Sequence, residues 1–199
     1  MKCFAVIAAL LAAAVATPAR SQMLRLDALP RALAGEPFGL ASTPAPAGPL
    51  WIRWRGFDDA RAAEGERRLA IVNRAVNLAV AYAGDERRFG RSDVWSGALE
   101  TFESGAGDCE DYAIAKFFVL RAAGVPDGDL RLVLAHNRSD GNVHAVLAVR
   151  DGGRWLILNN RRMAPLAEAD EDDLDPLFAL DAGGVRQFVT PAMTLAALP

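Results

Sequence analysis

The 199-residue sequence predicts an α+β fold, with helices first along the chain and an antiparallel sheet after them. Up to residue 123 the apolar residues recur at spacings of three and four, which is typical of helices packed on one face. From residue 130 the spacing changes to two, which is typical of half-buried strands. Gly152 and Gly153 separate two such stretches and predict a tight hairpin, a connection that joins antiparallel strands.

Three helices are predicted in the first half of the domain. The first, residues 64–83, turns leucine and valine side chains to one face and most of its arginines away from it. After a polar loop, a short helix starts at Ser92 or Asp93, both good capping residues, and ends at a glycine turn. The third covers residues 109–123, where a glycine and a proline stop it.

The strands of the sheet are predicted from alternating apolar residues. They are expected over residues 130–135, 143–150, 154–159 and 186–190. Between the last two lies an acidic stretch, residues 168–175, which is expected to be a solvated loop.

The first 50 residues predict export rather than folded structure. Residues 1–21 carry an early lysine, an apolar run and small residues, the pattern of a secretory signal peptide too short to stay in a bilayer. Residues 22–50 are rich in alanine and proline and predict an extended lead-in to a domain over residues 51–199. We expect a periplasmic protein without stable membrane insertion. Its net charge of −3 also argues against a nucleic-acid partner.

Cys109 is the one cysteine left once the signal peptide, which holds Cys3, is removed. A thiol without a disulfide partner in an oxidising compartment has no evident structural role. It stands where a glycine turn becomes a helix, and the N–H groups and dipole of a helix start lower a thiol pKa. We therefore predict a nucleophile; a buried inert thiol is the alternative.

A histidine and an asparagine in the predicted sheet are candidates for the residues that activate this thiol. A cysteine nucleophile needs a histidine to move its proton and a polar group to hold the histidine tautomer. His144 opens one strand, and simple hairpin register brings Asn159, at the end of the next strand, close to it; a slip by one would substitute Asn160. His136 is expected to be structural or exposed. A helix-start Cys with His and Asn on neighbouring strands is the papain-like and transglutaminase-like arrangement.

Three runs resemble the bacterial transglutaminase-like cysteine proteinases, the LapG-type periplasmic proteases. They are GDCEDYAIAK at residues 107–116, HAVLAV at 144–149 and LILNN at 156–160. The resemblance implies a Cys-His-Asp triad in which Cys109 and His144 match and Asn159 stands where aspartate is usual. Asparagine can still orient the histidine but cannot give a protonated imidazole a full counter-charge. The asparagine is therefore expected to affect the rate of the reaction and its dependence on pH.

Three acidic residues flank the predicted nucleophile. Asp108, Glu110 and Asp111 supply carboxylate oxygens, which suit a hard cation, but acids at a helix start are also good caps. The residues alone leave both roles open. The resemblance implies that these three acids bind Ca²⁺ beside the nucleophile.

The resemblance implies a periplasmic cysteine endopeptidase acting on a protein substrate. In that family the expected substrate is the N-terminal region of a large surface adhesin. An inner-membrane cyclic di-GMP receptor would sequester the protease, so that release of the adhesin promotes biofilm dispersal. The alternative is a non-catalytic binding module whose triad has drifted, which the asparagine at 159 favours.

Overall fold

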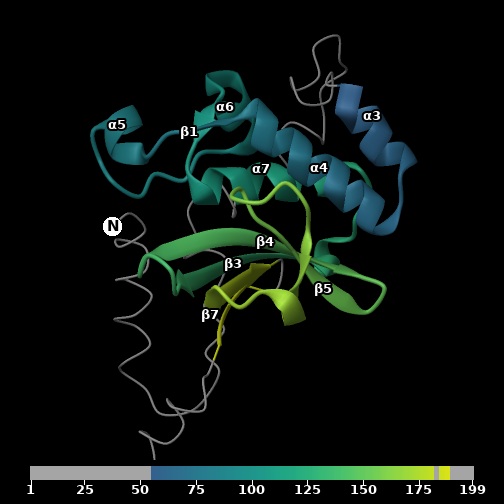
Figure 1. Cartoon of the computed structure of the whole chain (residues 1–199). Helices are drawn as coiled ribbons and strands as arrows, with labels where there is room; N and C mark the ends of the chain where they lie inside the picture. Colours follow the sequence, from purple (N-terminus) through teal and green to yellow (C-terminus); the bar gives the residue numbers. More distant parts are fainter. Residues whose placement is uncertain (1–54, 182–183, 189–199) are drawn as a thin grey trace, which may run out of the picture.

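The computed structural model describes residues 55–181 and 184–188 (Figure 1). The predicted signal peptide 1–21 and lead-in 22–50 lie outside the described residues, as do residues 51–54 and 189–199 of the predicted domain. None of the helices in the described ranges has the length and apolar character needed to cross a bilayer.

Five helices precede the sheet within the described residues. They are α3 (Arg55–Ala62), α4 (Gly65–Ala79), α5 (Asp85–Phe89), α6 (Ala98–Ser104) and α7 (Cys109–Ala122). Helix α4 is shorter than predicted, because the chain extends after Val80 into β1 (Ala81–Tyr82). Strand β1 pairs in parallel with β2 (Ala106–Gly107), directly before α7. The loop predicted before the second helix contains α5, and α6 begins after Gly97 rather than after Ser92 or Asp93.

An antiparallel sheet, of six strands in the part of the chain that the structure describes, follows as the α+β prediction requires. The strands are β3 (Leu130–Asn137), β4 (Val143–Asp151), β5 (Arg154–Leu158), β6 (Leu166–Ala167), β7 (Leu174–Asp181) and β8 (Gly184–Gln187). Their spatial order is β6-β5-β4-β3-β7-β8. Strands β4 and β5 form the predicted hairpin, with Asp151 paired to Arg154 across the two glycines.

Strand β7 was not predicted, although it lies beside β3 in the sheet. Its first residues belong to the acidic stretch that the sequence assigned to a loop, and Pro176 interrupts its alternating pattern. The ladder with β3 is irregular at this point: Leu134 pairs with Phe178, but Ala135 pairs with Pro176. A proline is tolerated at such an irregularity because it has no N–H to give to a regular ladder.

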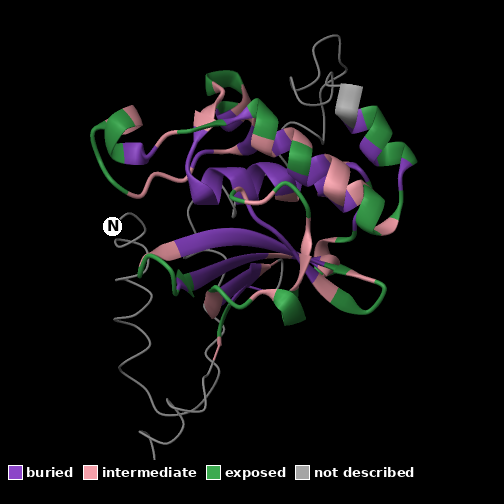
Figure 2. Cartoon of the chain, in the orientation of Figure 1, coloured by how far each residue is buried: buried purple, intermediate pink, exposed green. Residues whose placement is uncertain are grey.

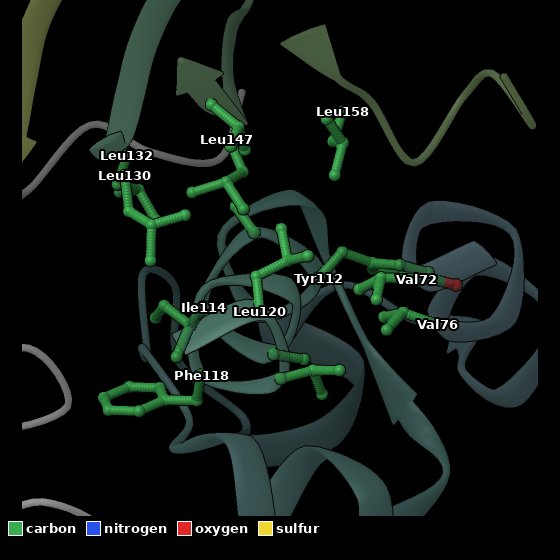
Figure 3. Packing of buried hydrophobic residues seen from close by; sticks show 14 of the residues in the cluster. Val72, Val76, Tyr112, Ile114, Phe118, Leu120, Leu130, Leu132, Leu147 and Leu158 are labelled. Atoms are coloured by element: carbon green, nitrogen blue, oxygen red, sulfur yellow. The ribbon is translucent and has the colours of Figure 1, made fainter. Parts of the chain in front are cut away.

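The main core lies between the helices and one face of the sheet (Figures 1 and 2). Helix α7 is buried along almost its whole length, covered by the sheet on one side and by α4 and α6 on the other. Valines of α4, apolar residues of α7 and leucines of β3, β4 and β5 meet there (Figure 3). Helix α7 is therefore a rigid support for whatever its first residue carries.

Candidate active site

The turn before α7 is built to hold Cys109 at the helix start. Gly107 ends β2, and its carbonyl accepts a hydrogen bond from Ala83 N–H (2.9 Å) beside β1. A Cβ atom on Gly107 would lie 2.7 Å from the Cβ of Asp111, a distance that real side chains do not adopt. Glycine is required here because the next turn of the helix packs against its backbone.

Cys109 is the first residue of α7, as predicted, and its side chain is largely buried. The thiol Sγ lies 3.1 Å from Glu110 Oε2, so the S–H group donates to a carboxylate. A neighbouring carboxylate favours the protonated thiol, whereas the helix N-terminus favours the thiolate. The ionisation of Cys109 therefore depends on the charge of the acids around it.

His144 and Asn159 are brought together. His144 Nε2 lies 2.9 Å from Asn159 Oδ1, and both residues are buried. Asn159 stands just past β5, which ends at Leu158 rather than at residue 159 as predicted. Asn160 makes no such contact, and its Oδ1 has no hydrogen-bond partner among the described residues. His136, at the end of β3, is exposed.

The hydrogen bonds of Asn159 fix the tautomer of His144. Asn159 Oδ1 also accepts from the backbone N–H of Arg161 (3.0 Å), which can only donate, so this atom is the carbonyl oxygen. His144 Nε2 must then carry the proton, and Nδ1 is the basic nitrogen. Burial, more than any other cause, lowers the pKa of His144 from 6.5 to about 4. The ring is therefore neutral at physiological pH and able to accept a proton.

An acidic group lies directly beside Cys109. Ligand oxygens of Asp85, Asp108 and Glu110 come within 4.8 Å of one another, and all three residues are buried. Burial raises the pKa of Asp108 to about 6. Burial, with the nearby charges of Cys109 and Asp108, also raises the pKa of Glu110 well above its ordinary value. Burial and mutual repulsion both favour the protonated form of carboxyl groups gathered in this way.

The four acids near the helix start have two different environments in the structure. Asp108 holds the N-cap position of α7, yet its side chain makes no capping hydrogen bond, and its Oδ1 has no hydrogen-bond partner among the described residues. Asp111, predicted to join Asp108 and Glu110, instead accepts from Arg88 Nη1 (2.5 Å) and from Ser96 N–H (2.8 Å). Asp85 takes the third place in the acidic group.

Asp85 was not predicted from the sequence, because it lies 24 residues before Cys109 in a segment that was expected to be a polar loop. The segment does hold a signal: Gly84 followed by two acids begins a short helix. Pairing of β1 with β2 brings that helix next to the nucleophile turn. The contact thus depends on a ladder of two residues in each strand, which is too short to produce a recognisable period in the sequence.

Comparison with known proteins identifies the class of fold. Residues 58–169 match the family model described as bacterial transglutaminase-like cysteine proteinase, BTLCP. The structure is similar to Legionella pneumophila LapG at 28% identity and a TM-score of 0.60, over 71% of this chain and 79% of that one. An EGTA-treated form of the same protein is similar at 30% identity and a TM-score of 0.59, over 66% and 72% of the two chains.

A calcium-bound form of Legionella pneumophila LapG is also similar, at 26% identity and a TM-score of 0.52, over 68% of this chain and 87% of that one. No match is found among curated proteins. Because the family model covers more than half of the sequence, the chain belongs to the bacterial transglutaminase-like cysteine proteinases. It is a cysteine protease by family and has the transglutaminase-like fold.

Proposed function

We propose that this chain is a periplasmic endopeptidase whose catalytic residues are Cys109, His144 and Asn159. The observation that carries the proposal is the hydrogen bond between His144 Nε2 and Asn159 Oδ1, with the oxygen identified by Arg161 N–H. The bond leaves a neutral Nδ1 as the base. Cys109 stands at the start of α7, and α7 packs against β4, the strand that carries His144.

The proposed reaction follows from these groups. His144 Nδ1 takes the thiol proton of Cys109, and Sγ attacks the carbonyl carbon of the scissile peptide bond. The amine leaves with the proton from His144, which gives a thioester on Cys109. Water then hydrolyses the thioester, with His144 again acting as the base. Asn159 keeps the imidazole oriented throughout, while an aspartate would also stabilise its charged form.

The acidic group supports a calcium site beside the nucleophile. Asp85, Asp108 and Glu110 offer buried carboxylate oxygens, the donor type that Ca²⁺ prefers, and the Oδ1 of Asp108 lacks a hydrogen-bond donor in the described structure. A bound calcium ion would supply positive charge next to the thiol. Asp108 fits a hard cation better than a capping role, since its side chain makes no capping hydrogen bond. Asp111 would act indirectly, by holding Arg88 and Ser96 behind the turn.

Calcium is therefore expected to raise the melting temperature, because an ion that binds only the folded chain stabilises it by mass action. At a free concentration 100 times the dissociation constant the gain is about 2.7 kcal/mol. The measurement is a thermal melt with calcium and with EGTA. Asp85→Asn should remove most of the shift, whereas Asp140→Asn, an exposed acid in the β3–β4 loop, should not. Equal melting curves, together with activity insensitive to EGTA, would leave the group without a metal.

Asn159→Asp is expected to preserve or raise activity, because a carboxylate can accept from both His144 Nε2 and Arg161 N–H and adds charge for the imidazolium. Asn159→Ala should lower kcat without unfolding the chain. The same changes at Asn160 serve as the control and should be nearly silent. If Asn160→Ala lowered activity and Asn159→Ala did not, the residue that orients His144 would be Asn160 and our assignment would be wrong.

The biological substrate and partner remain those that the family resemblance implies. We propose export to the periplasm, cleavage of the N-terminal region of a large surface adhesin, and control by an inner-membrane cyclic di-GMP receptor. Support comes from the motif around Cys109 and from the similarity to Legionella pneumophila LapG.

The proposed protease activity can be tested without knowing this substrate. The purified chain is incubated with a library of denatured bacterial peptides, and new termini are identified by mass spectrometry. A parallel sample is first treated with iodoacetamide at mildly acidic pH, where only an activated thiol reacts rapidly. Cleavage that iodoacetamide blocks supports the proposal. Sluggish labelling of Cys109 and no new termini would favour a binding module.

A further inference from the structure

The turn that carries Asn159 is held in place by helix α4. Asn73 and Asn77 are one helical turn apart, so their side chains share a face of α4. Asn73 is buried, and its Nδ2 donates to the carbonyl oxygens of Arg162 (2.8 Å) and Met163 (3.0 Å). Asn77 is half-buried, and its Nδ2 donates to the carbonyl oxygens of Asn159 (3.0 Å) and Arg162 (2.9 Å).

These bonds satisfy backbone groups that a surface turn usually leaves to water. Within the turn, Arg162 N–H donates to the Asn159 carbonyl (3.3 Å). The carbonyl of Asn159 thus has donors from α4 and from its own turn, while its side chain meets His144 and Arg161. Fixing the backbone of a residue limits where its side-chain oxygen can lie.

The stability of α4 alone does not account for the two asparagines. Asparagine is a weak helix former, and alanine or leucine at either position would favour the helix more. The Oδ1 atoms of both residues are buried without a hydrogen-bond partner among the described residues, and each such atom is unfavourable. Within the described part of the chain, only the NH₂ group of each amide forms hydrogen bonds, and all of them go to the turn after β5.

We propose that Asn77, supported by Asn73, is a positioning residue for the His144–Asn159 pair. It holds the turn after β5 so that Asn159 Oδ1 meets His144 Nε2, and it acts through Asn159 without touching the reacting atoms. The inference rests on the proposed catalytic role of His144 and Asn159.

The kinetic test compares Asn77→Ala with wild type in the presence of calcium. We expect kcat to fall by about ten- to a hundredfold with KM nearly unchanged, as for other residues that orient a reactive group. Arg68→Ala is the matched control, since Arg68 also donates from α4 to a backbone carbonyl, that of Ala63 (2.7 Å), away from the turn. Asn77→Ala combined with Asn159→Ala should be no slower than Asn159→Ala alone. Fully additive losses would overturn the inference.

A second measurement needs no substrate. Nitrogen-15 NMR of the imidazole groups reports the tautomer of His144, which should be a single Nε2–H form in wild type and a mixture in Asn77→Ala. If Asn77→Ala does not fold, Asn77→Asp is the second variant. It keeps the side-chain volume but places carboxylate oxygens against the carbonyl oxygens of the turn, so a mixture of His144 tautomers is again expected. A wild-type chain that cleaves nothing would refute the proposed function while the spectra still test this inference. An unchanged His144 tautomer with unchanged kcat would refute the inference itself.

Discussion

Cys109→Ala is expected to abolish proteolysis and to leave the fold intact. Cys109 is the only cysteine among the described residues, so no second thiol there can replace it. Loss of the nucleophile removes the covalent route altogether. The fold should persist because alanine continues the helix and only one sulfur atom is lost from the edge of the core.

The measurement is cleavage of the peptide library, with circular dichroism and a thermal melt as controls for folding. Cys109→Ser is a useful companion, since it keeps the shape but not the reactivity of the thiol. Full activity in the folded alanine variant would refute the assignment of the nucleophile and, with it, the proposed mechanism.

His144→Ala is expected to lower kcat by roughly 10²–10⁴-fold, the range that a positioned general base contributes. His136→Ala should have little effect, because His136 is exposed at the end of β3. The two variants form a matched pair, since they are the two histidines of the sequence. The measurement is kcat of both variants by steady-state kinetics at neutral pH. Should His136→Ala be the damaging change instead, the assigned base would be wrong.

The same histidine predicts a dependence of stability on pH. Burial lowers the pKa of His144 from 6.5 to about 4 in the folded chain, so between these values the unfolded chain binds a proton that the folded chain does not. Acidification through this window therefore lowers the contribution of His144 to the free energy of unfolding, by up to about 3 kcal/mol when the pH reaches 4. Asp108 acts in the opposite direction, because its pKa is raised to about 6 in the folded chain. Comparison of wild type with His144→Ala isolates the histidine: in urea unfolding at pH 7 and at pH 4.5, the change in unfolding free energy on acidification should be more favourable for the alanine variant than for wild type.

Local signals in the sequence are enough to predict most of the elements. Apolar spacing indicated α4, α7, β3, β4 and β5, because burial of one face demands a fixed period. Strand β7 was missed because its proline and acids resemble those of a loop. The segment forms a strand because it pairs with β3, and the energy of such pairing cannot be read from the sequence of one segment alone.

The sequence by itself predicts the chemistry that we propose for the turn before α7. Cys109 follows Gly107 and Asp108 at a helix start, and this short-range order is enough to predict a reactive thiol flanked by acids. The hairpin glycines likewise placed His144 and Asn159 on neighbouring segments.

Only the tertiary structure shows which acidic side chains gather beside Cys109. The acidic group contains Asp85 and not Asp111, whose carboxylate accepts hydrogen bonds from Arg88 and from Ser96 N–H instead. The pairing of β1 with β2 places the helix that carries Asp85 next to the turn before α7. The tertiary structure also sets two asparagines of α4 against the turn that carries Asn159. These contacts join residues far apart in the chain, and their geometry depends on how helices and sheet pack together. The period of any one element specifies which face is buried, but not which residue lies opposite.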